Sequence, residues 1–412
     1  MNLLRYCYTV LCVLLFAGAA EAAGGVITGD LRFFQAQENY CPNSRNCVGS
    51  MYTQSDFNVY APIADIKIYL EDASGNVIGQ STTNSSGQFT LSWYSPGLPA
   101  QVTLEWRSEH KDGRFAIRTP SAGALYMGWW SFTPVDGTTV LSPQNIGTGN
   151  WGTSGTPNQI LNAYDGARRM WHYSLQYSNR MVTNFTGIDI RAFSNSGPLG
   201  TCSSSCAGGT TVQLDAQSDT YRMPQGRILH ELGHIARVLS RDWLWVSNYN
   251  FNSQPGWTLG SDEHKVDAFE EGLATFFGDV AFYWSNAVEP HTCITAAACN
   301  TGSFNLETSR STSCSDPDDY RRAISVDRYL WDIYDTTQDG ANSESISQNY
   351  STFFDALASY PSGYGDGQHN EPFSSPTVID DFDGRSALDF SNNYFAFTSV
   401  NEWSALSQNC DP

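Results

Sequence analysis

The sequence predicts a multidomain chain, in which an all-β sandwich is followed by a domain of mixed α and β structure. Residues 65–70 alternate between polar and apolar side chains, which is the period of a half-buried strand. Residues 226–241 instead carry an apolar stripe at helical spacing. Between these regions, residues 142–156 are rich in Gly, Asn, Thr and Ser, as linkers are. We therefore expect two folded domains joined by this linker.

Length and composition set the outer limits of this interpretation. The 412 residues are enough for two or three domains, and a hydrophobic content of 41% is that of a globular chain. The net charge of -20 repels nucleic acid and anionic lipid, so we exclude nucleic-acid binding. We expect a signal peptide at 1–22, the β-sandwich at 23–141, the linker at 142–156 and the second domain at 157–412.

The N-terminus has the pattern of a secretory signal peptide. Arg5 supplies the positive start, residues 10–16 the short apolar region, and residues 17–22 the small side chains of a cleavage zone. A retained membrane anchor is the alternative, but the apolar run is short for a membrane span. We find no second run of spanning length, so we expect no stable membrane insertion and a secreted or periplasmic location.

Cysteine usage agrees with export. Ten cysteines occur, and the two within the signal peptide leave an even number in the mature chain. An even number in an exported chain favours disulfides formed in an oxidising compartment. A zinc site built from thiolates is the alternative, but no CxxC pair is present. The spacing suggests the pairs Cys41–Cys47, Cys202–Cys206 and Cys293–Cys299, which leaves Cys314–Cys410.

The first domain shows short strands separated by turn residues. Besides residues 65–70, we expect strands at 88–91, 102–106 and 115–118, with a turn at 72–76. This spacing favours a sandwich. The segment 62–89 resembles the transthyretin-like or carboxypeptidase-regulatory-like β-sandwich, from which the chain departs by a cysteine-bearing insertion at about 35–58.

The second domain begins with a helix signal and continues with strands. Thr156-Pro157 fits a helix N-cap followed by a first-turn proline. Residues 187–193 and 211–214 have the composition of strands. Two further helices are expected downstream, at about 262–284 and 317–335, whereas the last sixty residues show no clear period.

The helix expected at 226–241 contains His230-Glu231-Leu232-Gly233-His234, an HExxH pattern. Residues four apart lie on the same face of a helix, so His230 and His234 can both bind one metal ion. Glu231 lies one position round the helix, where it can reach a water molecule but is badly placed to be a third ligand. The arrangement is typical of zinc hydrolases.

A catalytic zinc usually has three protein ligands. The metzincin pattern would need a histidine six residues after His234, but Ser240 stands there and Arg237 replaces the required glycine. Glu270-Glu271-Gly272-Leu273-Ala274 instead resembles the gluzincin signature, in which the glutamate before glycine is the third ligand. Glu271 shares its helix face with small residues, which favours it over Glu270. Glu270 and His264 stay open as alternatives.

This resemblance implies an α+β zincin-like catalytic domain at 157–412, a zinc ion (Zn2+) held by His230, His234 and Glu271, and peptide hydrolysis with Glu231 as general base. It also implies an edge strand that pairs with an extended peptide or protein substrate, for which residues 211–214 are our candidate. No motif for binding a free amine is present, so endopeptidase cleavage is the leading interpretation. Asp267 and Asp279 are candidates to hold the histidine rings; Tyr334, Arg328 and His369 are candidates to stabilise the oxyanion.

Two other functions stay open. One is an exported zincin-like binding or adhesion protein with little activity, although the intact Glu231 argues against it. The other is a zinc amidase that acts on cell-wall material. Acidic clusters at 335–339 and 380–384 could bind calcium, but neither has EF-hand spacing and both are more typical of solvated turns. Substrate preference and oligomeric state are not determined by these patterns.

Overall fold

The structure is a computed structural model, and it describes part of the chain. The described residues are 22–35, 59–146, 150–151, 157–194, 196–202, 205–215, 225–240, 265–283, 306 and 323–334. The expected signal peptide, the cysteine-bearing insertion, the acidic clusters and the last sixty residues therefore lie outside the described residues. Among the described helices, none is both long enough and apolar enough to cross a membrane.

The chain divides into two compact units, which supports a multidomain protein. The first is drawn from Met1–Phe33, Pro62–Arg107 and Met127–Ser154, and the second from Phe34–Ala61, Ser108–Tyr126 and Gly155–Pro412. The sequence predicts that all of 23–141 lies in the first domain. Residues 108–126 belong with the second unit instead, because strand β7 (Phe115–Arg118) pairs in parallel with strand β12 (Ile188–Arg191), far along the chain.

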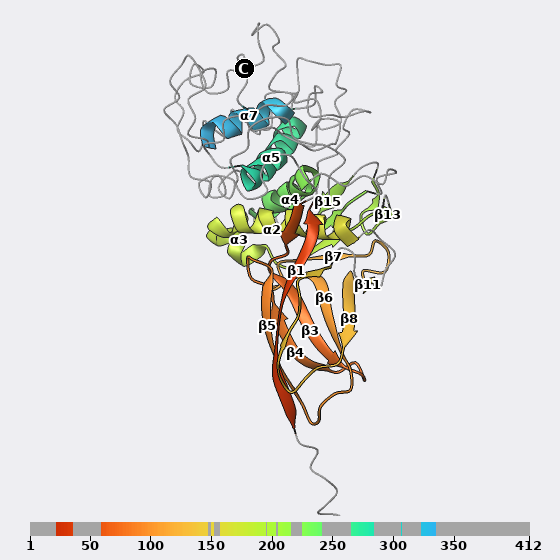
Figure 1. The fold of residues 1–412 in the computed structure, drawn as a ribbon. Helices are drawn as coiled ribbons and strands as arrows, with labels where there is room; N and C mark the ends of the chain where they lie inside the picture. The colour runs from red at the N-terminus through yellow and green to blue at the C-terminus, as the bar shows by residue number, and fades with distance from the viewer. Residues whose placement is uncertain are drawn as a thin grey trace, which may run out of the picture. The chain divides into compact units, whose positions relative to one another are not determined.

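The first unit is rich in β-structure, as expected, and its strands follow one mixed sheet path. The path runs β10-β1-β5-β4-β3-β6, with β9 on β1, β8 on β6 and β11 on β8 (Figure 1). The strands are β1 (Ala23–Gln35), β3 (Ile66–Asp72), β4 (Val77–Thr82), β5 (Gln88–Ser95), β6 (Val102–His110), β8 (Met127–Phe132), β9 (Gly137–Val140), β10 (Gln144–Asn145) and β11 (Asn150–Trp151). A further short strand, β2 (Val59–Pro62), lies at the boundary in sequence between the second unit and the first.

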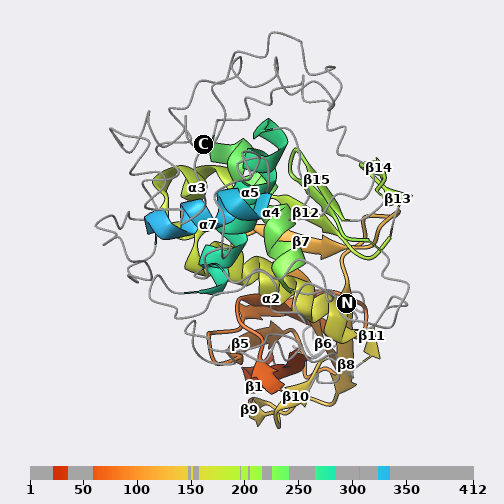
Figure 2. The ribbon, with the colours of Figure 1, turned by 90° about the horizontal axis from the view of Figure 1, so that it is seen from above.

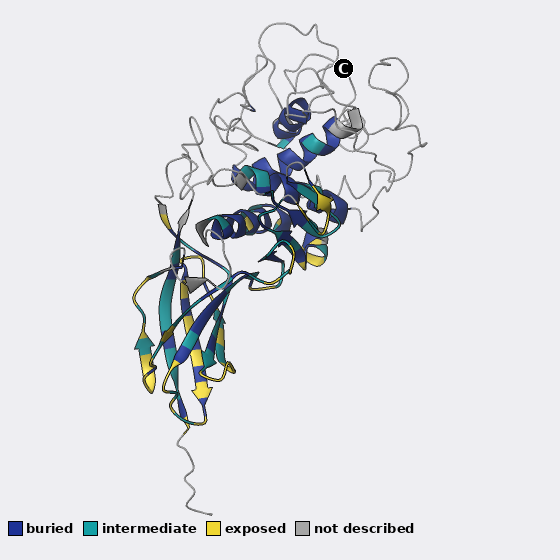
Figure 3. Cartoon of the chain, turned by 90° about the vertical axis from the view of Figure 1, so that its right-hand side faces the viewer, coloured by how far each residue is buried: buried dark blue, intermediate teal, exposed yellow. Residues whose placement is uncertain are grey.

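Alternation of side chains builds the core of this unit. Along β5, every second residue is buried: Phe89, Leu91 and Trp93 belong to the core, and their neighbours are exposed. Buried and exposed positions likewise alternate along strands of this unit in Figure 3. β3 repeats the pattern, which confirms the strand predicted at 65–70. The predicted turn after it is closed by Asp72, whose Oδ1 accepts hydrogen bonds from the backbone N–H groups of Ser74 and Asn76 at 2.8 and 2.9 Å.

The second unit combines a small sheet with a group of helices. The sheet order is β7-β12-β16-β15, in which β16 is parallel to β12 and β15 is antiparallel to β16. α2 packs on β7, and α4 packs on β15 and β16 and also against α2 and α5 (Figure 2). The further elements are α2 (Pro157–Tyr173), η1 (Leu175–Tyr177), α3 (Asn179–Asn184), β13 (Ser196–Gly197), β14 (Gly200–Thr201), β15 (Cys206–Gly208), β16 (Thr211–Gln213), α4 (Gln225–Ser240), α5 (Lys265–Phe282) and α7 (Ala323–Tyr334).

The edge of this sheet is not the strand that we expected. Residues 211–214 were our candidate, but β16 is paired on both sides, with β12 and with β15. The short strand β15 occupies the end of the sheet path instead. The prediction failed because β15 has only three residues and no period of its own, so its existence depends on pairing with β16.

Candidate metal centre

The helix α4 carries the HExxH pattern and is anchored by its apolar stripe. Ile228, Leu232, Ile235 and Leu239 are fully buried, as the spacing predicted. His230 lies on a different face of α4 and is itself only 4% exposed. The apolar side therefore fixes the helix in the core of the second unit, while the histidines are directed to another neighbour.

That neighbour is α5, and glycine permits its close approach. A Cβ atom added to Gly233 would lie 2.2 Å from the backbone oxygen of Ala274, a distance that no real side chain tolerates. One turn further along α5, a Cβ on Gly278 would lie 3.1 Å from Cβ of Leu229. The two helices therefore touch backbone to backbone beside the histidines, which agrees with the small residues expected on this face of α5.

The close contact brings three potential ligands together. Nε2 of His230 lies 3.1 Å from Oε2 of Glu271, and Nε2 of His234 lies 3.5 Å from the same oxygen. All three ligand atoms lie within 4.8 Å of one another. Two imidazoles from one helix and a carboxylate from another thus form a group that could hold a metal ion.

A hydroxyl group supports the first of these ligands. Nδ1 of His230 lies 3.0 Å from Oγ1 of Thr275, which donates its own proton to the backbone oxygen of Glu271 at 2.7 Å. The hydroxyl of Thr275 has one proton, which it donates to the backbone oxygen of Glu271, so it accepts in its contact with His230. The His230 ring is therefore the donor in this contact, from Nδ1. Its Nε2 then carries the lone pair that a metal needs. Thr275 therefore holds the ring of His230. Of the two aspartates expected to hold the histidine rings, Asp279 is buried on α5, and the side chain of Asp267 lies outside the described residues.

Burial and charge set the protonation of the site. Burial lowers the pKa of His230 to about 4, so its ring is neutral at neutral pH. Burial also acts to raise the pKa of Glu271, but the histidines beside it outweigh this effect and the pKa is lowered. Both ligands therefore favour the deprotonated forms that bind metals.

Glu231, the candidate general base, lies on α4 directly after His230 and is 4% exposed. Burial raises the pKa of its carboxyl group to about 7, and the negative charge of Asp215, just beyond β16, acts in the same direction. A buried carboxyl group with a raised pKa beside a cluster of metal-binding groups is typical of a group that transfers protons.

The neighbouring glutamate has a different partner. Glu270 is fully buried and forms an ion pair with Arg237 of α4, which is also buried. The sequence pattern did not predict this pair, although a charged residue on the buried part of an apolar helix requires a partner. Glu270 is thereby turned to Arg237, while Glu271 faces the histidines. His264, the other alternative, lies outside the described residues.

Two of the three candidates for oxyanion stabilisation, Tyr334 and Arg328, belong to the described helix α7. The ring of Tyr334 packs against Phe276 and Trp331, at centroid distances of 6.0 and 5.4 Å. Arg328 is buried within α7. His369 lies outside the described residues. Packing therefore accounts for the aromatic character of the helix that contains Tyr334.

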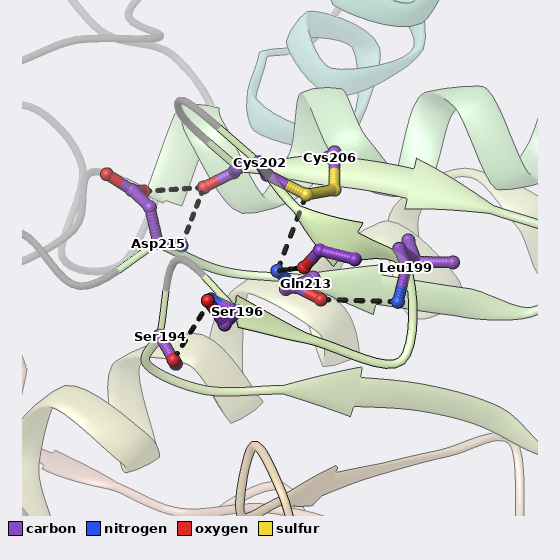
Figure 4. Close-up of a disulfide and its surroundings, with 9 residues drawn as sticks. Ser194, Ser196, Leu199, Cys202, Cys206, Gln213 and Asp215 are labelled. Atoms are coloured by element: carbon purple, nitrogen blue, oxygen red, sulfur yellow. Dashed lines mark hydrogen bonds between the residues drawn. A yellow bond between two sulfur atoms is a disulfide. The ribbon is translucent and has the colours of Figure 1, made fainter.

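Of the four predicted disulfides, Cys202–Cys206 is present, and the other three lie outside the described residues. This disulfide joins the residue after β14 to the first residue of β15 (Figure 4). Ser205, next to it, donates a hydrogen bond to Oδ1 of Asp215 at 2.7 Å. The disulfide thus lies at the edge of the sheet on which α4 packs.

Comparisons with known proteins leave the family of the chain open. No family model matches the sequence, and no curated protein matches it. Among solved structures, the crystal structure of the major plantain pollen allergen Pla l 1 is matched at 14% identity, over 30% of this chain and 92% of that chain, with a TM-score of 0.18. A TM-score this low carries no structural argument, so the site itself is the basis for a function.

Paired substitutions of the two glutamates test which one holds the metal. Glu271→Gln is expected to lower zinc affinity by more than about 100-fold, beyond the upper range for partners that only orient a ligand. Glu270→Gln is expected to keep zinc but to destabilise the fold by about 3 kcal/mol, because it removes the carboxylate that pairs with the buried Arg237. Metal analysis and thermal unfolding measure the two effects. Zinc loss in Glu270→Gln with retention in Glu271→Gln would reverse the assignment.

Proposed function

We propose that the protein is an exported zinc metallopeptidase of the gluzincin type that cleaves within extended peptides. The observation that carries this proposal is the convergence of Glu271 Oε2 on both histidine Nε2 atoms, at 3.1 and 3.5 Å, from a separate helix. The sequence resemblance had named the same three residues. Convergence of that trio in space supports a zincin-like catalytic domain in the second part of the chain.

The donor set fits zinc. Two imidazole nitrogens and one carboxylate oxygen are the ligands of a common class of catalytic zinc site, which keeps one further position for water or substrate. With Nδ1 hydrogen-bonded to Thr275, Nε2 is the ring nitrogen whose lone pair would bind the metal, and it lies on the side of Glu271. When bound, zinc supplies a Lewis acid that activates water and polarises a carbonyl group.

The remaining chemistry belongs to residues of the chain. The carboxylate of Glu231 accepts a proton from the attacking water and then donates it to the nitrogen of the leaving amine. Its burial favours this exchange near neutral pH, since a carboxyl group with a pKa of about 7 can both accept and release a proton there. Thr275 holds the His230 ring in the orientation that the metal requires.

The position of β15 at the end of the sheet path is an argument for a peptide substrate. It ends the sheet path on one side and packs against α4, the helix that carries His230, His234 and Glu231. An extended peptide can add to such an edge through backbone hydrogen bonds. Export is supported by the Cys202–Cys206 disulfide, since disulfides persist in oxidising compartments.

A chelator-controlled assay tests the function. The purified protein is incubated with an unfolded protein, with and without a metal chelator, and fragments are followed by mass spectrometry. We expect cleavage within the chain that the chelator abolishes and added zinc restores. Absence of chelator-sensitive cleavage across varied proteins would favour a binding or adhesion role. Cleavage of cell-wall amides without cleavage of peptides would favour an amidase.

A further inference from the structure

The buried side-chain amide of Gln213 forms hydrogen bonds to the β13–β14 hairpin, and it extends from β16 in the sheet of the second unit. The side chain of Gln213, the last residue of β16, is fully buried. Its Nε2 donates to the backbone oxygen of Gly200 at 3.2 Å, and its Oε1 accepts from the backbone N–H of Leu199 at 3.4 Å (Figure 4). The β13–β14 hairpin is therefore held by one side chain that projects from the central part of the sheet.

The side-chain amide of Gln213 also contacts the disulfide. Nε2 of Gln213 lies 3.4 Å from Sγ of Cys202, and Cys206 stands directly opposite Gln213 in the register between β15 and β16. The Cys202–Cys206 bond closes the loop between hairpin and edge strand. Ser205 adds a second attachment, because its Oγ donates to Oδ1 of Asp215 and accepts from the backbone N–H of that residue at 3.2 Å.

These attachments stabilise β15, a strand that forms few backbone hydrogen bonds of its own. The strand has three residues, and its only strand partner in the described sheet path is β16. So few backbone pairs leave a short edge strand prone to fraying, because each adds only about 1 kcal/mol of net stability. The hairpin lies over it, since a Cβ atom on Gly208 would meet Cδ2 of Leu199 at 3.3 Å. The position of β15 thus depends on side chains outside the strand.

We propose that Gln213 and the Cys202–Cys206 disulfide are positioning elements that hold β15 in place to receive an extended peptide. This inference rests on the proposed peptidase function. No residue of this cluster belongs to the His230, His234 and Glu271 group. Loss of the cluster should therefore weaken the binding of long peptides, which use the edge strand, while metal binding and the hydrolysis of a dipeptide amide are unchanged.

Three variants of the full-length zinc-loaded protein test this. The Cys202→Ser, Cys206→Ser double variant removes the disulfide, and Gln213→Leu removes the amide at similar volume. Ser194→Ala is the matched control, because Ser194 lies in the same region and its Oγ accepts a hydrogen bond from the backbone N–H of Ser196, which involves neither β15 nor the disulfide. In the first two, we expect KM for a long peptide to rise about tenfold, the size of one or two lost hydrogen bonds. Zinc content, kcat and dipeptide-amide hydrolysis should match the wild type, and the control should change nothing.

Parallel losses for both substrates, or an unchanged KM for the long peptide, would overturn the inference. Amide hydrogen exchange gives a readout that does not need turnover. In the double variant, the amides of 206–208 should lose protection while those of 188–191 keep it; equal protection of β15 in both proteins would also overturn the inference. A wild-type protein that cleaves neither substrate would instead contradict the proposed function.

Discussion

A Gly233→Ala variant is expected to fold with α4 displaced from α5 and to lose metal binding. The added Cβ would lie 2.2 Å from the backbone oxygen of Ala274, and 2.8 Å from both its Cα and its carbonyl carbon. Backbone atoms cannot turn aside as the end of a flexible side chain can, so the helices must separate. Overpacking of this kind costs about 1–3 kcal/mol or more.

The metal site should respond more strongly than the fold. His230 and His234 lie on α4 and Glu271 on α5, so separation of the helices moves the ligands apart directly. A functional constellation tolerates displacements of only about 0.5 Å. Zinc affinity, measured by titration with a competing chelator, should therefore fall by about 100-fold or more, as for loss of a partner that orients a ligand.

Gly166→Ala is the matched control for this prediction. Gly166 lies on α2, where an added Cβ would meet Cγ2 of Ile228 on α4 at 3.5 Å, an ordinary van der Waals contact. Alanine also favours a helix over glycine by about 1 kcal/mol. The control should keep its zinc and unfold at the same or a higher temperature. If Gly233→Ala bound zinc as tightly as the control, the close contact between α4 and α5 would not define the site.

A Glu231→Gln variant is expected to keep zinc and to lose about a thousandfold in turnover, within the range for removal of a general base. Glutamine has the shape of glutamate but cannot accept the proton of water. The carboxyl group is buried, and burial raises its pKa, so a neutral isostere should not destabilise the fold. Steady-state kinetics on a peptide, together with metal analysis and thermal unfolding, separate these effects.

This experiment distinguishes a catalytic role of Glu231 from a role in maintaining the metal site. Retained turnover with zinc bound would remove Glu231 from the role of general base, even if hydrolysis still depends on the metal. Loss of zinc together with turnover would place Glu231 among the groups that maintain the site. The Glu271→Gln variant is the reference for that second result, because Glu271 lies within 3.1 Å of His230 Nε2.

Much of the local structure could be predicted from the chain. The helix expected at 226–241 is α4 (Gln225–Ser240), and the strand expected at 65–70 is β3 (Ile66–Asp72). The pair Cys202–Cys206 was also predicted from spacing and is present. These features share one cause: each depends on residues close together in sequence, whose period or spacing is visible before folding.

Contacts between distant segments were predicted less well. The boundary at 141 did not anticipate that β7 joins β12 in a parallel pair, in which Phe115 stands opposite Ile188. The edge strand was placed at β16, although β15 covers it. Parallel pairing and short edge strands leave no local period in the sequence, because their hydrogen-bond partners are supplied by other parts of the chain.

By itself, the sequence determined that two histidines four residues apart share a helix face and that an acidic helix follows them, because helix geometry is local. Only the tertiary structure decided how that second helix is turned. Glu271 faces the histidines because Gly233 admits the backbone of Ala274 and because Glu270 is held by Arg237. It also decided that Thr275 orients the His230 ring. These are properties of two packed surfaces, and neither helix specifies them alone.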